Sequence, residues 1–117
     1  MVDEYMRMWN VNTNVMCRQH LLGEHRETHT LIGCLRKGIS VKGYVDKGLV
    51  EISNIKKRHD KLVKEMNKRG YNHKTPITEY YNLINNGHIN SKNNLIELAR
   101  RCTECRKMIT NARKNKT

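Results

Sequence analysis

The chain has 117 residues, of which 37% are hydrophobic and none is Phe, so it is long enough for one domain with a modest core. Its formal charge of +12 favours a polyanionic partner, either nucleic acid or an anionic membrane surface. No apolar run approaches the roughly 20 residues that span a bilayer, and the charged residues among the first nine argue against a signal peptide. We therefore expect a soluble, cytoplasmic protein whose four cysteines are thiols.

Apolar residues at steps of three and four predict three main helices, over about residues 14–37, 51–69 and 91–111. Glycines should end the first two, at Gly38 and Gly70. The connections 38–50 and 71–90 contain turn-forming residues and read as irregular. We predict an all-α fold: three main helices around one small core with long irregular connections. Residues 1–117 should form a single domain, with 1–5 as an extension and 112–117 as a basic tail.

The first predicted helix gathers polar side chains along one edge. At 3.6 residues per turn, His20, Glu24 and Glu27 fall on one line with Arg26 on its flank. An ordinary salt bridge would explain Glu27. A carboxylate beside cations stays ionised, however, and repels phosphate in a groove that binds DNA, so such a group usually has a function. A catalytic role for Glu27 is therefore an equal alternative.

Two groups of residues have the spacing of metal ligands. Cys102 and Cys105 form half of a zinc site, but they also lie on the apolar face of the third helix, and we interpret them as core positions with zinc as the alternative. His25 and His29 lie one turn apart, a geometry that can hold a metal. Arg26 beside them opposes this, so we predict no metal ligands and no cofactor.

Positive charge is concentrated in two segments. Residues 54–69 carry a net charge of +5 and residues 100–117 one of +6. Like-charged patches repel each other in a small fold unless a polyanion offsets them. This pattern predicts contacts with phosphate.

Three sequence blocks resemble the pyrimidine-dimer DNA glycosylases of the bacteriophage endonuclease V type, over roughly residues 6–72. They are Gln19-His20-Leu21-Leu22-Gly23-Glu24-His25-Arg26-Glu27, Gly33-Cys34-Leu35-Arg36-Lys37 and Lys68-Arg69-Gly70-Tyr71-Asn72. The first block is specific to the family and the others are short. The resemblance implies an all-α enzyme that repairs ultraviolet-damaged, double-stranded DNA as a monomer, without a membrane or cofactor.

The resemblance also implies a mechanism. In this family the α-amino group of the mature N-terminal residue attacks C1′ of the damaged nucleotide, a Schiff base forms, the glycosidic bond breaks, and elimination nicks the strand. The position of the family nucleophile is Met6 and that of its essential glutamate is Glu27. An α-amine has a pKa near 7.7–8, so an appreciable fraction is a neutral nucleophile at neutral pH.

The predicted site therefore has Met6 and Glu27 as catalytic residues. Its expected DNA-binding residues are Arg7, Gln19, His20, Arg26, Arg36, Lys37, Lys56, Lys57, Lys68 and Arg69. The chain departs from the family at three points: residues Met1 to Tyr5 precede the nucleophile position, Thr30 replaces a second arginine, and the aromatic, lysine-bearing C-terminal segment is missing.

These departures leave two alternatives to the glycosylase with associated AP lyase activity. One is a non-catalytic relative of the same fold that binds nucleic acid or a nucleotide. The other, a weaker one, is a metal-dependent nuclease that uses His25, His29 and Glu24.

Overall fold

The computed structural model of the chain describes residues 7–73, 75–81 and 86–114. These residues contain no strand, which confirms the all-α prediction. The α-helices are α1 (Arg18–Arg36), α2 (Lys42–Asp46), α3 (Ile55–Lys68), α4 (Ser91–Arg101) and α5 (Thr103–Lys114). Two single 3-10 turns, Thr13–Val15 and Ile52–Asn54, precede α1 and α3. None of the described helices combines the length and apolarity needed to cross a membrane.

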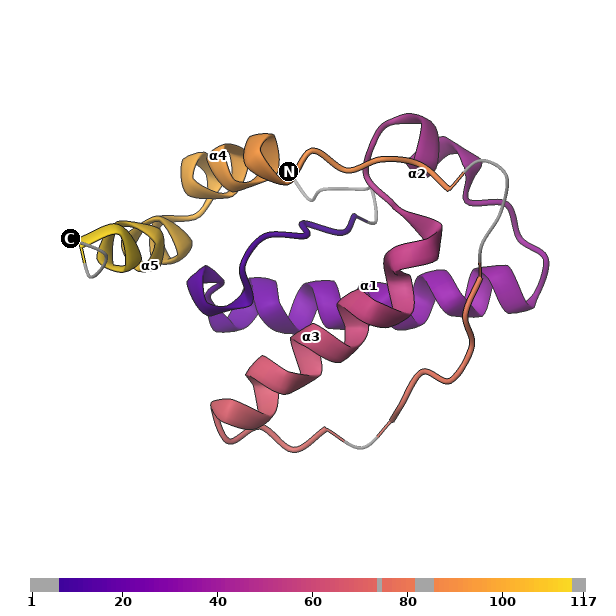
Figure 1. Cartoon of the computed structure of the whole chain (residues 1–117), viewed down its shortest axis with the longest axis horizontal. Helices are drawn as coiled ribbons and strands as arrows, with labels where there is room; N and C mark the ends of the chain where they lie inside the picture. The colour runs from indigo at the N-terminus through magenta and orange to yellow at the C-terminus, as the bar shows by residue number, and fades with distance from the viewer. Residues whose placement is uncertain (1–6, 74, 82–85, 115–117) are drawn as a thin grey trace.

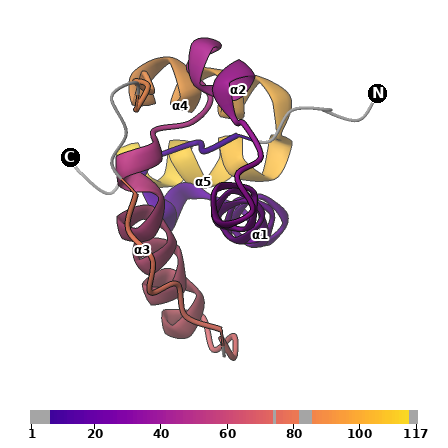
Figure 2. The same cartoon turned by 90° about the vertical axis from the view of Figure 1, so that its right-hand side faces the viewer.

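Helix α1 is the longest helix of the described chain, and its main packing partner is α3. It begins after Cys17 and ends before Gly38, whose φ of 74° is the left-handed conformation expected of a terminating glycine. Helix α3 crosses α1 obliquely and extends away from it, as the two views in Figures 1 and 2 show. The early part of the α1 prediction, residues 14–17, instead forms the end of a 3-10 turn and the helix cap.

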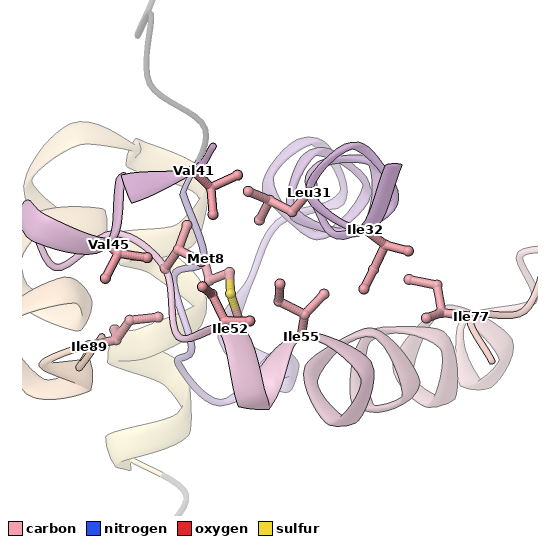
Figure 3. Packing of buried hydrophobic residues seen from close by; sticks show 10 residues of the cluster. Met8, Leu31, Ile32, Val41, Val45, Ile52, Ile55, Ile77 and Ile89 are labelled. Atoms are coloured by element: carbon pink, nitrogen blue, oxygen red, sulfur yellow. The ribbon is translucent and has the colours of Figure 1, made fainter. Parts of the chain in front are cut away.

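The buried side chains form two clusters. One joins the second half of α1 to α2 and the start of α3, where Leu31, Ile32 and Ile55 meet (Figure 3). The other joins the start of α1 to α3, α4 and α5, and includes Trp9, Leu21 and Leu98. Segment 7–11 contributes to both clusters, so the chain that leads into α1 belongs to the core.

The third predicted helix is broken in two. Helix α4 ends at Arg101 and α5 begins at Thr103, because Cys102 between them is extended, with φ −125° and ψ 114°. Leu98, Cys105 and Ile109 are buried as the apolar pattern predicted. The break therefore changes the direction of the helix while both halves keep their apolar faces in the core.

Candidate active site

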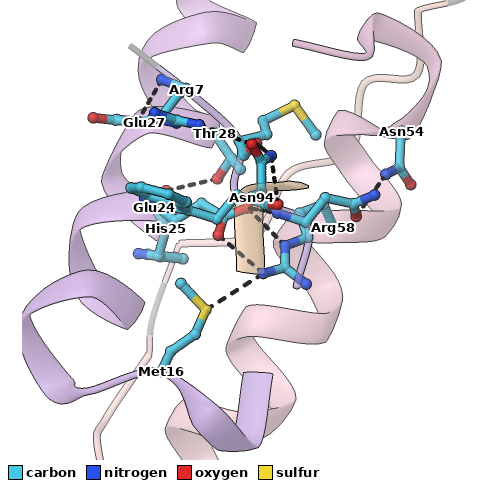
Figure 4. Close-up of polar contacts among 12 residues, drawn as sticks. Arg7, Met16, Glu24, His25, Glu27, Thr28, Asn54, Arg58 and Asn94 are labelled. Carbon is cyan, nitrogen blue, oxygen red and sulfur yellow. Dashed lines mark hydrogen bonds and ion pairs between the residues drawn. The ribbon is translucent and has the colours of Figure 1, made fainter. Parts of the chain in front are cut away.

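Glu27 lies on α1 beside the segment that leads into the fold from the N-terminus. Its side chain is half-buried, and its Oε2 accepts a hydrogen bond of 2.8 Å from the backbone N–H of Arg7 (Figure 4). Twenty residues separate the two partners in the chain. Met6, the predicted nucleophile position, lies outside the described residues, but Arg7 is the residue that follows it.

A residue of α4 fixes the position of this segment. Asn94, which is buried, accepts a 2.8 Å hydrogen bond from Nη2 of Arg7 and donates one of 2.9 Å to the carbonyl of Trp9. The Arg7 guanidinium also lies over the Trp9 ring, 3.8 Å from its centre. Arg7 is only 9% exposed, so its side chain holds the segment in place rather than facing DNA as predicted. Sequence reasoning missed Asn94, because 87 residues separate it from Arg7.

Glu24 is used differently from Glu27. Its carboxylate is buried and accepts hydrogen bonds of 2.7 and 2.9 Å from Nε and Nη2 of Arg58, on α3 (Figure 4). This bidentate pair ties α1 to α3 where the helices cross. Glu24 is thus engaged by a cation, and the structure does not support it as the metal ligand of the nuclease alternative.

The residues predicted to bind DNA divide into two groups. Besides Arg7, three of these residues make ion pairs or hydrogen bonds within the chain. Arg36 pairs with Glu79, Lys56 pairs with Asp60, and Arg69 pairs with Glu65 and donates a hydrogen bond to the carbonyl of Thr13. The contacts of Arg36 with Glu79 and of Arg69 with the Thr13 carbonyl join separate segments, whereas the Lys56–Asp60 pair lies within α3. Arg36 is exposed despite its ion pair, and the other exposed members are Gln19, Arg26, Lys37, Lys57 and Lys68.

Two shallow grooves run along α3. Lys56 and Lys57 line one of them and Lys68 lines the other, while Lys61 and Lys64 line both. The amphipathic pattern of α3 explains this arrangement, because its apolar residues face α1 and leave the lysines outside. The grooves form a positively charged surface suited to a phosphate backbone.

The histidine predicted to bind DNA, His20, lies in a different group of residues. His20 packs edge-on against Trp9, and its Nδ1 lies 3.2 Å from Sγ of Cys17. Cys102 and Cys105 complete this group, so two of the cysteines predicted as core positions adjoin a third cysteine and a histidine. Burial lowers the pKa of His20, which favours the neutral form of its ring.

The pair His25 and His29 belongs to a larger group. His59 of α3 and His73, which follows α3, bring their rings against it. Burial, followed by the neighbouring His59, His29 and His73, lowers the pKa of His25 to about 4. The structure therefore assembles two groups with the composition of metal sites, where the sequence favoured core positions and no metal ligands.

Comparison with known proteins identifies the family to which a chain with this geometry belongs. Residues 6–79 match the sequence profile of the pyrimidine dimer DNA glycosylase family, and the chain belongs to that family. The match covers the segment leading into the fold, α1 with Glu27, and α3. Searches of curated proteins and of solved structures give no significant match.

Proposed function

We propose that the protein is a DNA glycosylase with associated AP lyase activity, acting on pyrimidine dimers or another modified base in double-stranded DNA. The observation that carries the proposal is the hydrogen bond from the Arg7 amide to Glu27. It brings the chain directly after the family nucleophile position to the family glutamate. Family membership supplies the class of reaction, and this contact supports the assignment of the acid.

In this proposal a terminal amine attacks C1′ of the damaged nucleotide, and the glycosidic bond breaks with the base as leaving group. The attached nitrogen loses a proton, and the C1′–O4′ bond then breaks as O4′ takes up a proton, which opens the sugar ring and leaves a Schiff base between C1′ and the protein. Glu27 stabilises the cationic intermediate and moves protons during the elimination that breaks the strand. Either the amine of Met6 or that of a residue before it serves as nucleophile, depending on the start of the mature chain.

The exposed cations would hold the DNA around this site. Arg26 is the neighbour of Glu27 on α1, Lys37 lies at the end of the same helix, and Lys57 and Lys68 lie on α3. Expelling a base from the duplex costs a few kcal/mol, and contacts with phosphate offset that cost. Gln19, on the exposed side of the first turn of α1, is the polar member of this surface.

Borohydride trapping tests the proposal. The full chain is incubated with duplex DNA that carries a thymine dimer, reduced, and analysed for a covalent adduct and a strand nick. We expect an adduct whose peptide map places the DNA on a terminal amine. Glu27→Gln should lower nicking by at least about 100-fold, the usual loss for an acid–base catalyst, and leave DNA binding within a few-fold of the parent.

Thr30→Ala is the matched control on the same helix, because Thr30 is exposed and its hydroxyl donates a hydrogen bond to the Arg26 carbonyl within that helix. Its nicking rate should stay close to that of the parent. Tight binding to damaged duplex with neither adduct nor nick would overturn the proposal and leave the non-catalytic DNA-binding relative. Full activity in Glu27→Gln would remove Glu27 from the mechanism.

A further inference from the structure

Cys17, His20, Cys102 and Cys105 converge from two distant parts of the chain. Cys17 caps the start of α1 and His20 lies in its first turn. Cys102 separates α4 from α5, and Cys105 lies in the first turn of α5. Each pair has two residues between its members, the short spacing that lets one turn of chain supply two ligands to a single ion.

The distances within this group match a tetrahedral zinc site. Zinc bonds of about 2.3 Å to sulfur and 2.0–2.1 Å to nitrogen place two thiolates about 3.8 Å apart, and a thiolate and an imidazole nitrogen about 3.5 Å apart. Sγ of Cys17 lies 3.8 Å from Sγ of Cys102, and Nδ1 of His20 lies 3.2 Å from Sγ of Cys17 and 3.8 Å from Sγ of Cys105. All four ligand atoms lie within 4.8 Å of one another.

Backbone amides point at the sulfur atoms. The Cys105 N–H donates to Sγ of Cys102 at 3.4 Å, and the Cys17 N–H donates to Sγ of Cys105 at 3.1 Å. Such bonds are the outer contacts that orient the ligands of a metal site.

The break at Cys102 distinguishes a metal site from core packing. The apolar pattern continues through this position, and neither Gly nor Pro is present to end the helix. A continuous helix would satisfy the core. The extended conformation of Cys102 instead lets its sulfur cap the first turn of α5 while lying beside Cys17.

We propose that Cys17, His20, Cys102 and Cys105 bind one structural Zn²⁺ that fastens the junction of α4 and α5 to the start of α1. Three thiolates and one imidazole form a closed ligand set of the Cys₃His type, with no position left for a substrate. The metal would support a small core in a chain of this length, since its binding energy contributes to folding.

Metal analysis of the protein as purified tests this site, with Cys102→Ser compared against Cys34→Ser. Cys34 is a half-buried thiol of the other core cluster and is the matched control. We expect Cys102→Ser to lose one zinc per chain and Cys34→Ser to lose none. If the two variants hold the same zinc, or if native mass spectrometry of the parent finds no zinc, the proposal fails.

Cobalt substitution of the parent provides a readout that does not depend on a variant folding. Co²⁺ at this site should show the thiolate charge-transfer bands and the intense visible bands of a tetrahedral S₃N set. The parent should also leave only Cys34 reactive toward a thiol reagent until a chelator removes the metal. Absent charge-transfer bands, or four equally reactive thiols, would overturn the proposal.

A separate observation supports a second site, formed by His25, His29, His59 and His73. One ring nitrogen from each of the four lies within 4.8 Å of the others, and Nε2 of His29 lies 3.1 Å from Nε2 of His59. A tetrahedral site with nitrogen ligands at 2.0–2.1 Å requires about 3.3 Å. Nε2 of His25 and Nε2 of His73 are buried without a hydrogen-bond partner within the described chain.

The surroundings of His59 complete this arrangement. Its Nδ1 lies 2.9 Å from Oδ1 of Asp60, so the carboxylate fixes the ring with Nε2 directed into the group. A carboxylate behind a metal-binding histidine is the usual outer partner of such ligands. We infer that these four imidazoles bind a divalent transition metal such as Zn²⁺, which holds segment 71–73 against α1 and α3.

His73→Asn, compared with His88→Asn, tests the second site, because His88 is exposed and stands apart from the group. The first variant should lose one metal ion per chain while keeping the cobalt–thiolate bands of the Cys₃His site, and the second should lose none. Equal metal content in the two variants would overturn this inference. Co²⁺ bound to the Cys102→Ser variant should show the visible bands of a tetrahedral site without the thiolate charge-transfer bands. If these visible bands are absent, the inference of a four-histidine site is likewise overturned.

Discussion

Glu24 and Arg58 form a buried ion pair, 0% and 3% exposed, at the crossing of α1 and α3. Breaking such a pair from one side leaves an uncompensated charge in the core, which costs about 3–5 kcal/mol. Glu24→Gln keeps the shape of the side chain, so we expect it to lower the free energy of unfolding by roughly that amount. Urea unfolding followed by circular dichroism measures the loss.

The matched control is Asp46→Asn, which breaks the exposed pair between Lys42 and Asp46 on α2. Solvent screens exposed pairs so strongly that they contribute little to stability, and the urea midpoint should hardly move. Similar midpoints for the two variants would show that the Glu24–Arg58 pair does not stabilise the crossing.

At the scale of elements, hydrogen bonds hold the irregular segment that leads into α4 against the segment between α2 and α3. The Ile52 N–H donates to the Asn86 carbonyl at 2.8 Å, and the Ile89 N–H donates to Oε2 of Glu51 at 2.6 Å. Gly87 lies between these contacts with φ at 85°. The backbones approach so closely there that a Cβ on Gly87 would lie 2.3 Å from the Val50 carbonyl oxygen.

Gly87→Ala should therefore lower the free energy of unfolding by at least about 1–3 kcal/mol, through strain in φ and displacement of the Val50 carbonyl. Gly43→Ala, within α2, meets no atom within 4 Å and should leave stability unchanged or raise it by up to about 1 kcal/mol. Thermal unfolding of both variants checks this difference. Equal unfolding midpoints for the two variants would contradict the close approach of the Gly87 and Val50 backbones.

At the scale of the whole molecule, the charge of +12 makes salt dependence the signature of DNA binding. Each cation that contacts phosphate contributes about one unit to the slope of log affinity against log salt. Lys57→Ala and Lys68→Ala should each reduce that slope by about one on undamaged duplex, measured by fluorescence anisotropy.

Lys42→Ala is the comparison for these variants, since its side chain pairs with Asp46 on α2. Its slope should match that of the parent. An equal reduction of the salt slope in all three variants would mean that DNA binding depends only on the net charge of the protein, and that the lysines of α3 do not form a DNA-binding surface.

The sequence by itself determined the long helices, though not α2, and it singled out Glu27 as the acid proposed for catalysis. Repeats of three and four residues depend on neighbours within one or two turns, so α1, α3 and the buried faces of α4 and α5 followed from local pattern. The motif around Glu27 likewise lies within a single helix. The break at Cys102 escaped prediction, since no local breaker marks it.

Only the tertiary structure decided which distant groups meet. Arg58 reaches Glu24 across 34 residues, Cys102 lies beside Cys17 across 85, and Asn94 holds Arg7 across 87. His59 lies on the buried face of α3, and its partners come from α1 and from the segment after α3. Helical spacing carries no information on how helices cross, and it is the crossing of α1 with α3 and the turn between α4 and α5 that assemble these groups.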